Sequence, residues 1–594
     1  MMMYPTILKS NSFYMYTIQE NVRIVISLLK DYNIRHIVVN PGGTNIPIAQ
    51  AVQDDPFFHC YSVPDERSAM YFAIGLHLQT GEIIATSCTS AQATRNYVPG
   101  LTEAFYKHTP IVAITTSKLS RYTYQEYMQA PDQTSLPHDT VKKSYDLPPV
   151  TDENTRVLCC RLAKEAILEA MHRNPGPVQI NLRISDSQQP YFENVKLPQI
   201  RNVKRYMCWD KWDEVTLDNK KILIVVGEHR PFNDEQSHTI ESFCECYDAV
   251  VYVNHLSNYH GTYSINGNLL ISSGGMQQEG IKPDIVITIG GQTGDYSIYG
   301  TLVSGVGNAE HWRVSEDGAL VDTYNRLSKI FECPFDYFFR RLSDGKEKVD
   351  HPYFKRWKQL KSTLSYNVEV PFSNLYAAEQ LTPIIPDNSY INFAILNSLR
   401  TWSYFDMKPS VKAFSNVAAF GIDGCTSVLI GESMNTDQLC FLVTGDLAFF
   451  YDMNALGIRH IKNNVRILID NNHGGGEFRV MTNSWKNKPN VAPFISAEGH
   501  NGSAKGWAEN CGFEYLSASS KEEFERLLQK LVSPNENPIV LEMFTKPEDE
   551  PAAMSKFIAE NHFSNPSDKI KEVFKKVVGP KGIEYVKKMT HRGG

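Results

Sequence analysis

Two short stretches in the last third of the chain decide the fold: Thr444-Gly445-Asp446-Leu447-Ala448 and Asp470-Asn471-Asn472-His473-Gly474-Gly475. Apolar runs at 438–444 and 465–469 lead into them and predict strands, and the pattern between these runs predicts a helix over 453–462. The stretch from Asp446 to Asn472 has the length of one strand–helix–strand crossover. We therefore expect Asp446 and Asn472 at the carboxyl ends of neighbouring parallel strands, the edge where α/β sheets bind ligands.

The residue types at this edge suit a metal ion and a phosphate. A carboxylate oxygen of Asp446, an amide oxygen of Asn472 and a backbone carbonyl at Gly474 are hard donors that favour Mg²⁺ and leave positions for a diphosphate and water. The Gly445-Asp446 turn also opens a helix, whose free N–H groups favour an anion. A turn glycine followed by an N-capping aspartate is the alternative for the same letters.

The rest of the chain repeats the alternation of strands and helices. In the first third, helical patterns at 20–30 and 66–79 alternate with strand patterns, and the middle third adds three more strands. The predicted strands of these two parts are 34–40, 83–87, 111–115, 222–226, 249–253 and 284–289. Such alternation predicts parallel sheets covered by helices.

The predicted class is therefore α/β, with three domains that are each a mainly parallel sheet flanked by helices. Segments 187–202 and 343–351 lack periodicity and read as connectors. We place the domains at 12–190, 200–345 and 370–575. A chain of 594 residues, 42% hydrophobic and 21% charged, is too long for a single core.

Charge and cysteine content limit the partners. Lys+Arg 59 against Asp+Glu 66 gives a net charge of -7 without a long basic run, which argues against a nucleic-acid partner. No apolar run is long enough to span a bilayer, and no secretory signal is recognised. Eleven cysteines, close together only at Cys159-Cys160 and Cys244-Glu245-Cys246, favour free thiols. We expect a cytoplasmic protein that acts on small molecules, with no nucleic-acid or membrane partner.

Several motifs in a fixed order then identify a family resemblance. Asn40-Pro41-Gly42-Gly43, Asp65-Glu66-Arg67-Ser68-Ala69 and Gln129-Ala130-Pro131-Asp132-Gln133 resemble the pyrimidine-binding (PYR) domain of thiamine-diphosphate (ThDP) enzymes. Gly421-Ile422-Asp423-Gly424 and the two stretches quoted first resemble their diphosphate-binding (PP) domain. The resemblance is closest to 2-succinyl-5-enolpyruvyl-6-hydroxy-3-cyclohexene-1-carboxylate synthase (MenD). It covers both outer domains and is loose in the central one.

The resemblance implies ThDP and Mg²⁺ as cofactors and assigns roles to single residues. Glu66 is the acid beside the pyrimidine ring, and we expect burial under the cofactor to raise its pKa. Gln129 faces the reacting centre, and Ile422 is the wedge that bends the cofactor. Asp446, Asn472 and Gly474 are the metal ligands. The implied cofactor-binding residues are Pro41, Gly42, Glu66, Asn96, Ile422, Gly445, Asp446, Leu447, Ala448, Asn472, Gly474 and Gly475.

Each role has a plainer alternative. Glu66 also suits an ordinary charged first turn of a helix. Ile422 suits plain core, and Gln129 suits a loop amide bonded to backbone. The central segment has no GxGxxG loop, so FAD is not expected, although some relatives bind flavin without one.

The chain departs from the family pattern at its substrate arginines. Thr44, Val417 and Trp402 stand where arginines that grip carboxylates are expected, although Arg400 lies two residues before Trp402. A fourth basic segment is replaced by Gly294-Asp295-Tyr296-Ser297. Each lost charge-assisted hydrogen bond is worth about 1.5–3 kcal/mol. We therefore expect a substrate pair different from that of MenD.

Two residues are gained where the family has neutral ones. Glu477 replaces an apolar residue beside Gly474-Gly475-Gly476, and His473 replaces an asparagine. Either side chain suits a proton donor or a grip on a hydroxyl, and His473 equally suits a turn in left-handed geometry. Together with Glu66 and Gln129, Glu477 is a candidate catalytic residue.

The predicted reaction is decarboxylation of a 2-oxo acid with transfer of the acyl anion to an acceptor, which makes a carbon–carbon bond. Pyruvate as donor, or a neutral, hydroxyl-rich acceptor such as a keto sugar, suits a site with few arginines. A simple decarboxylase, a true MenD synthase and a catalytically silent scaffold are the alternatives. Retention of Glu66, Asp446 and Asn472 together counts against the scaffold. The resemblance also implies a homodimer or homotetramer with active sites shared between chains.

Overall fold

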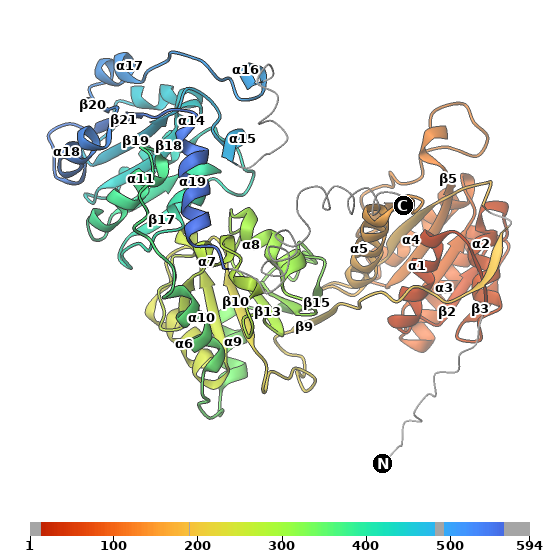
Figure 1. Cartoon of the computed structure of the whole chain (residues 1–594). Coiled ribbons are helices and arrows are strands. Elements are labelled where there is room, and N and C mark those ends of the chain that lie inside the picture. The colour runs from red at the N-terminus through yellow and green to blue at the C-terminus, as the bar shows by residue number, and fades with distance from the viewer. Residues whose placement is uncertain (1–13, 189–190, 481–491, 564–594) are drawn as a thin grey trace, which may run out of the picture. The chain divides into compact units, whose positions relative to one another are not determined.

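The computed structural model describes residues 14–188, 191–480 and 492–563. It contains two compact units, one formed by Met1–Arg205 with Leu320–Ser328 and the other by Tyr206–Ala319 with Lys329–Gly594. Three sheets of six to seven strands, flanked by helices, make up the fold, so the predicted α/β class is confirmed (Figure 1). No described helix is long and apolar enough to cross a membrane, and all eleven cysteines are free.

The first unit is built on a six-stranded parallel sheet with the order β3-β2-β4-β5-β7-β6. Alternate residues of its strands enter two separate cores, as Ile37 and Val38 of β2 do. Helices α1 (Glu20–Asp31) and α5 (Glu153–Ala170) cover one face, and α3 (Glu66–Thr80) and α4 (Gln92–Tyr106) cover the other (Figure 1). The strands are β2 His36–Val39, β3 His59–Ser62, β4 Ile84–Cys88, β5 Ile111–Lys118, β6 Ser144–Leu147 and β7 Val178–Ile184.

The C-terminal sheet has the order β17-β16-β18-β19-β21-β20, which repeats the order of the first sheet strand for strand. The expected similarity of the first and last thirds therefore extends to their topology. Its strands are β16 Tyr390–Phe393, β17 Lys412–Ser415, β18 Cys440–Gly445, β19 Val465–Asn471, β20 Glu514–Ala518 and β21 Ile539–Phe544. The helices on its two faces are α11 Asn374–Leu381, α18 Lys521–Val532 and α19 Asp549–Glu560 on one, and α13 Cys425–Ser433, α14 Asp446–Tyr451 and α17 Lys505–Asn510 on the other.

This shared strand order places a ligand crevice in each outer sheet. The chain reverses its direction of winding between β2 and β4 in the first sheet and between β16 and β18 in the last. Ligands of open α/β sheets bind at such a switch point, outside the carboxyl ends of the strands. The loops that begin at Asn40 and at Gly445 therefore border the two crevices.

The central sheet has the order β12-β11-β10-β13-β14-β15-β9 and is parallel from β12 to β14. Its core is shared with α6 (Asp234–Cys246) and α9 (Phe335–Ser343). The predicted strands 222–226 and 249–253 match β10 and β11, and the third begins one residue late, at Ile285. The strands are β9 Lys204–Met207, β10 Ile222–Val226, β11 Ala249–Val253, β12 Ser264–Asn266, β13 Ile285–Ile289, β14 Glu310–Val314 and β15 Leu327–Glu332.

Two predictions about local structure are wrong. The helix expected over 453–462 is instead α14, which starts directly after β18, followed by a short 3-10 turn at Met453–Gly457. Helix α14 ends at Tyr451, because the next residue, Asp452, has a backbone outside the helical range, with φ -125°. The Asp452 carboxylate accepts from the Ser427 N–H at 2.6 Å and from its hydroxyl at 2.8 Å, in the first turn of α13. The connector 187–202 contains β8 (Phe192–Val195), which pairs antiparallel with β1 (Tyr14–Thr17).

The stretch between α9 and α10 (Pro352–Lys361) contains no helix or strand, and its role as a connector between domains stays a prediction. We retain 12–190, 200–345 and 370–575 as proposed domain boundaries. Residues 12–13, 189–190, 481–491 and 564–575 of these ranges lie outside the described part of the chain.

Candidate functional site

Asp446 lies at the carboxyl edge of the C-terminal sheet, as the sequence predicts. Strands β18 and β19 are parallel neighbours, with Gly445 opposite Asp470. The Asp446 carboxylate is almost fully buried, at 1% exposure, and accepts the Leu447 N–H at 2.6 Å and the Gly474 N–H at 2.9 Å. This last bond joins the two stretches that decided the fold, so the structure brings these predicted residues together.

A third partner of Asp446 is His500, which the sequence reasoning missed. Its Nε2 lies 3.0 Å from Asp446 Oδ2, and its Nδ1 accepts the Gly502 N–H at 3.1 Å. Since Nδ1 accepts, Nε2 carries the proton and donates to the carboxylate. Its only sequence signal is the turn-forming glycines on either side, in Gly499-His500-Asn501-Gly502.

Further acidic side chains crowd behind Asp446. Asp470 accepts the Thr545 hydroxyl at 2.7 Å, and Glu550 accepts the Asn374 N–H at 2.7 Å. Burial raises the pKa of Asp446, of Asp470 and of Glu550, and the charge of Asp446 adds to the rise for Asp470. Several carboxyl groups thus share a region poor in water, an arrangement that a bound cation would stabilise.

The loop after β19 requires glycine. Gly474 has φ 155°, and a Cβ there would lie 2.8 Å from Glu498 Cα. A Cβ at Gly476 would lie 2.7 Å from Asn472 Nδ2. His473 adopts φ 63°, and its Nδ1 is 3.1 Å from the His500 carbonyl, which agrees with the turn-residue alternative. The backbone here is packed too closely for most side chains.

Ile422 lies beside the same sheet. It is half-buried and packs against both hydrophobic cores of the C-terminal domain. Its position therefore agrees with the core alternative, and its role as a wedge stays a prediction. Leu447 is half-buried and Ala448 is buried, both in α14.

In the first unit, the loop after β2 is held by its own neighbours. Gly42 has φ 153°, and a Cβ there would lie 2.2 Å from Thr89 Cβ. Thr44 is buried, its hydroxyl lies 2.8 Å from those of Thr89 and Thr116, and it accepts the Ser90 N–H. Pro41 and Gly42 are exposed.

Glu66 is the first residue of α3 and is half-buried. Asn96, on α4, donates from Nδ2 to Glu66 Oε2 at 3.2 Å. Asp65, not Glu66, caps the helix by accepting the Ser68 N–H at 2.8 Å. The structure thus brings together two residues that the sequence assigned to the cofactor, and it leaves the Glu66 carboxylate without a capping role.

Gln129 is exposed, at φ 56°, in the loop after β5. It lines a surface pocket together with Arg95, Tyr124, Tyr127 and Asp132. Hydrogen bonds, led by the one from the Thr134 backbone, hold the pKa of Asp132 well below its usual range. No role for Gln129 at a reacting centre is tested by this geometry, so that role stays a prediction.

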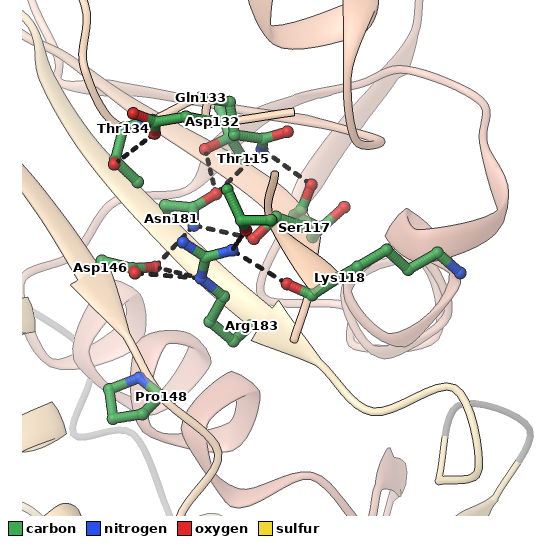
Figure 2. A network of polar contacts seen from close by, with 12 residues as sticks. Thr115, Ser117, Lys118, Asp132, Gln133, Thr134, Asp146, Pro148, Asn181 and Arg183 are labelled. Atoms are coloured by element: carbon green, nitrogen blue, oxygen red, sulfur yellow. Dashed lines mark hydrogen bonds and ion pairs between the residues drawn. The ribbon is translucent and has the colours of Figure 1, made fainter. Parts of the chain in front are cut away.

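A buried polar network anchors this loop to the sheet (Figure 2). Gln133 donates to the Thr116 carbonyl and to Asn181 Oδ1, both at 2.9 Å, and accepts the Ala91 N–H. Arg183 Nε donates to both carboxylate oxygens of Asp146, at 2.9 and 3.0 Å. Because its anchor residues are satisfied and buried, the loop that carries Gln129 has a fixed base.

Glu477 and Arg400 form a bidentate ion pair. Arg400 Nη1 and Nη2 donate to Glu477 Oε2 and Oε1 at 2.9 and 3.0 Å. The side chain of Arg400 is 5% exposed and that of Glu477 18%. Both carboxylate oxygens are thus engaged, which does not favour the proton-donor role expected from the sequence, although no observation tests that role directly.

The residues that replace the expected arginines have structural partners. Trp402 is fully buried and donates from Nε1 to Asn374 at 2.9 Å, and Val417 is fully buried. Asp295 caps the short helix α8 (Tyr296–Gly300) by accepting the Ser297 N–H. Thr44 is enclosed as described above. None of these side chains offers a cation to a carboxylate substrate.

Comparison with known proteins gives one family throughout. Residues 20–136 match the thiamine pyrophosphate enzyme, N-terminal TPP binding domain. A 2-succinyl-5-enolpyruvyl-6-hydroxy-3-cyclohexene-1-carboxylate synthase of Phocaeicola vulgatus is 32% identical over 562 residues, 91% of this chain and 98% of the relative. The chain belongs to the thiamine pyrophosphate enzymes. It is a ThDP-dependent enzyme related to MenD.

Other relatives carry the same description. The synthase of Bacteroides thetaiotaomicron is 31% identical over 552 residues, 89% of this chain and 97% of the relative. That of Flavobacterium johnsoniae is 28% identical over 542 residues, 88% of this chain and 95% of the relative. The similarity to these synthases therefore extends across all three sheets.

The residues at the two crevices fit a ThDP enzyme. The edge at β18 offers a buried carboxylate, the Asn472 amide and a stretch of glycines without side chains, and its excess of acidic groups favours a cation. Among the described residues, no group of three or more His, Cys, Asp or Glu side chains is arranged to hold a metal. A metal here would rely on amide and carbonyl oxygens as well, which suits Mg²⁺ rather than zinc.

Proposed function

We propose that this ThDP enzyme decarboxylates a 2-oxo acid and transfers the acyl group to an acceptor, forming a carbon–carbon bond. The observation that carries the proposal is the Asp446–Gly474 bond at the sheet edge, with Asn472 beside it. It occurs in a chain that spans nearly the full length of relatives named as synthases. The resemblance adds Mg²⁺ to ThDP as a cofactor.

The proposed roles follow the positions of the side chains. Bound ThDP would supply a nucleophilic carbon for attack on the 2-oxo group and a cationic ring that takes up the electron pair left when CO2 departs. Glu66 holds and releases a proton at its carboxylate, which Asn96 orients through the 3.2 Å hydrogen bond. Asp446, Asn472 and the Gly474 carbonyl would hold Mg²⁺, and through it the diphosphate. Gln129 would face the substrate from its anchored loop.

A panel of 2-oxo acids tests the reaction type. The protein is incubated with ThDP, Mg²⁺ and each acid, with and without acceptors that include keto sugars, while CO2 and aldehyde are measured. We expect CO2 release that depends on an acceptor, with pyruvate among the active donors. CO2 with free aldehyde would identify a simple decarboxylase. No CO2 from any member would favour the scaffold.

Isochorismate with 2-oxoglutarate is expected to be a poor pair, below about 1 s⁻¹, the lower end of ordinary turnover. The physical reason is that Thr44, Trp402 and Val417 are buried and uncharged, so they cannot bind the carboxylates of these substrates. Steady-state rates with the purified protein measure this directly. Turnover of that pair at about 1 s⁻¹ or more would overturn this expectation and restore the MenD assignment.

We also propose at least a homodimer with shared active sites, as the resemblance implies. Glu66→Gln and Asp446→Ala chains, each inactive alone, are mixed under conditions that allow subunit exchange. With shared sites, one site of each mixed dimer combines the intact Glu66 and the intact Asp446. Random exchange makes about half the dimers mixed, so about a quarter of the parent activity should return. No recovery despite proven exchange would show that each chain builds its site alone.

A further inference from the structure

Helix α12 (Asn397–Trp402) begins at the ligand crevice of the C-terminal sheet. It follows β16, one of the two strands at the switch point, and the other, β18, leads to Asp446. The chain enters α12 through Leu396 at φ 68°, a conformation that a branched side chain rarely adopts. Asn397 and Arg400 lie three residues apart, on one side of the helix.

Arg400 is the cation at this helix, and its charge is already matched. Besides the two bonds to Glu477, Nη1 donates to Asn397 Oδ1 at 3.0 Å. Its buried Nε has no hydrogen-bond partner among the described residues. The charge of buried Asp295 also acts on Arg400, but that carboxylate accepts the Ser297 N–H. Glu477 is therefore the carboxylate that binds the Nη1 and Nη2 atoms of Arg400, the pair of donors that we call its fork.

The pair lies directly beside the proposed metal ligand. A Cβ on Gly476, the neighbour of Glu477, would meet Asn472 Nδ2 at 2.7 Å and Asn397 Nδ2 at 3.4 Å. Asn472 and Asn397, which bonds to Arg400, thus both border Gly476, the residue before Glu477. A substrate bound beside these residues would contact an ion pair with no net charge and not an unpaired arginine.

We propose that Glu477 determines donor specificity by filling the carboxylate-binding fork of Arg400, so that the site selects 2-oxo acids with an uncharged tail. The inference rests on the proposed function for the identity of the ligand as a donor. A dicarboxylic donor would have to displace a carboxylate of the same chain, which is present at millimolar or higher effective concentration. It would also leave the displaced Glu477 carboxylate without its cation.

The first test is a binding measurement that needs no turnover. Glutarate, a non-reacting dicarboxylate, is titrated calorimetrically into the ThDP- and Mg²⁺-loaded protein. We expect no measurable binding to the parent and at least tenfold tighter binding to Glu477→Gln, because the amide leaves the guanidinium one charge short. The double variant Arg400→Gln with Glu477→Gln should lose the gain. Glu498→Gln is the matched control, since it breaks the Arg479–Glu498 pair in the same part of the fold and should gain nothing.

Unchanged glutarate affinity in folded Glu477→Gln, or an equal gain in the double variant, would overturn the inference. If Glu477→Gln does not fold, the parent protein alone still tests the inference, by comparison of two donors. It should release CO2 from 2-oxobutyrate with a kcat/KM at least tenfold above that for 2-oxoglutarate, and equal values would overturn the inference. The two proposals can fail separately. If Glu477→Gln binds glutarate but the protein decarboxylates no 2-oxo acid, Arg400 still binds a carboxylate as inferred, and the proposed function is refuted instead.

Discussion

Glu66→Gln is expected to lose at least about a hundredfold in turnover, within the range that general acid–base groups contribute, while binding ThDP nearly as well as the parent. Glutamine keeps the shape of the side chain, and its amide oxygen can still accept from Asn96. What disappears is the proton that the carboxylate holds and releases. The measurements are CO2 release under saturating donor and ThDP affinity by calorimetry.

Glu153→Gln is the matched control for Glu66→Gln. Glu153 is likewise the first residue of a helix in the same unit, α5, but its side chain is 74% exposed and pairs with Arg156. If Glu66 were only an ordinary charged first turn, both variants would behave alike, with changes of a few tenths of a kcal/mol in stability. Turnover of Glu66→Gln within threefold of the parent would end its catalytic assignment.

The sequence predicted the parts of the site that depend on strand order. Strands β18 and β19 are buried on both faces, so they read as apolar runs, and one crossover between them forces Asp446 and Gly474 to the same edge. Glu66 and Asn96 come together because α3 and α4 cover the same face of the first sheet. In both cases helices or strands carry these residues or end within a few residues of them, so the order of these elements determines which residues meet.

The sequence failed where an irregular loop or a long-range contact decides. His500 reaches Asp446 from 54 residues away through a loop whose course has no periodic pattern. Arg400 meets Glu477 across 77 residues, and the family pattern had placed the expected arginine at Trp402. The helix predicted over 453–462 is absent, and the residue before it, Asp452, bonds instead to Ser427, a tertiary contact that a local pattern does not show. Such contacts are set by packing and not by propensity.

Asp446→Ala is expected to lose cofactor retention almost completely. The substitution removes the one buried carboxylate proposed as a metal ligand and leaves the Gly474 N–H and His500 without their acceptor. The parent should gain about 2.7 kcal/mol of stability at ligand concentrations a hundred times its Kd, whereas the variant should gain almost nothing. Thermal unfolding with and without ThDP and Mg²⁺ measures both gains and separates them from any loss in the unliganded protein.

Asp452→Ala provides the control that makes the Asp446 result specific to the metal. Asp452 directly follows helix α14, but its carboxylate binds the Ser427 backbone and hydroxyl and does not approach Gly474. Removing it costs helix capping, about 0.5–2 kcal/mol, and should leave the cofactor-dependent gain intact. A general weakening of the packing between α13 and α14 would affect both variants alike, while a lost metal ligand affects Asp446→Ala alone. ThDP affinity unchanged in Asp446→Ala at saturating Mg²⁺ would contradict the metal assignment, and the Asp446–Gly474 bond would then serve only to hold the loop.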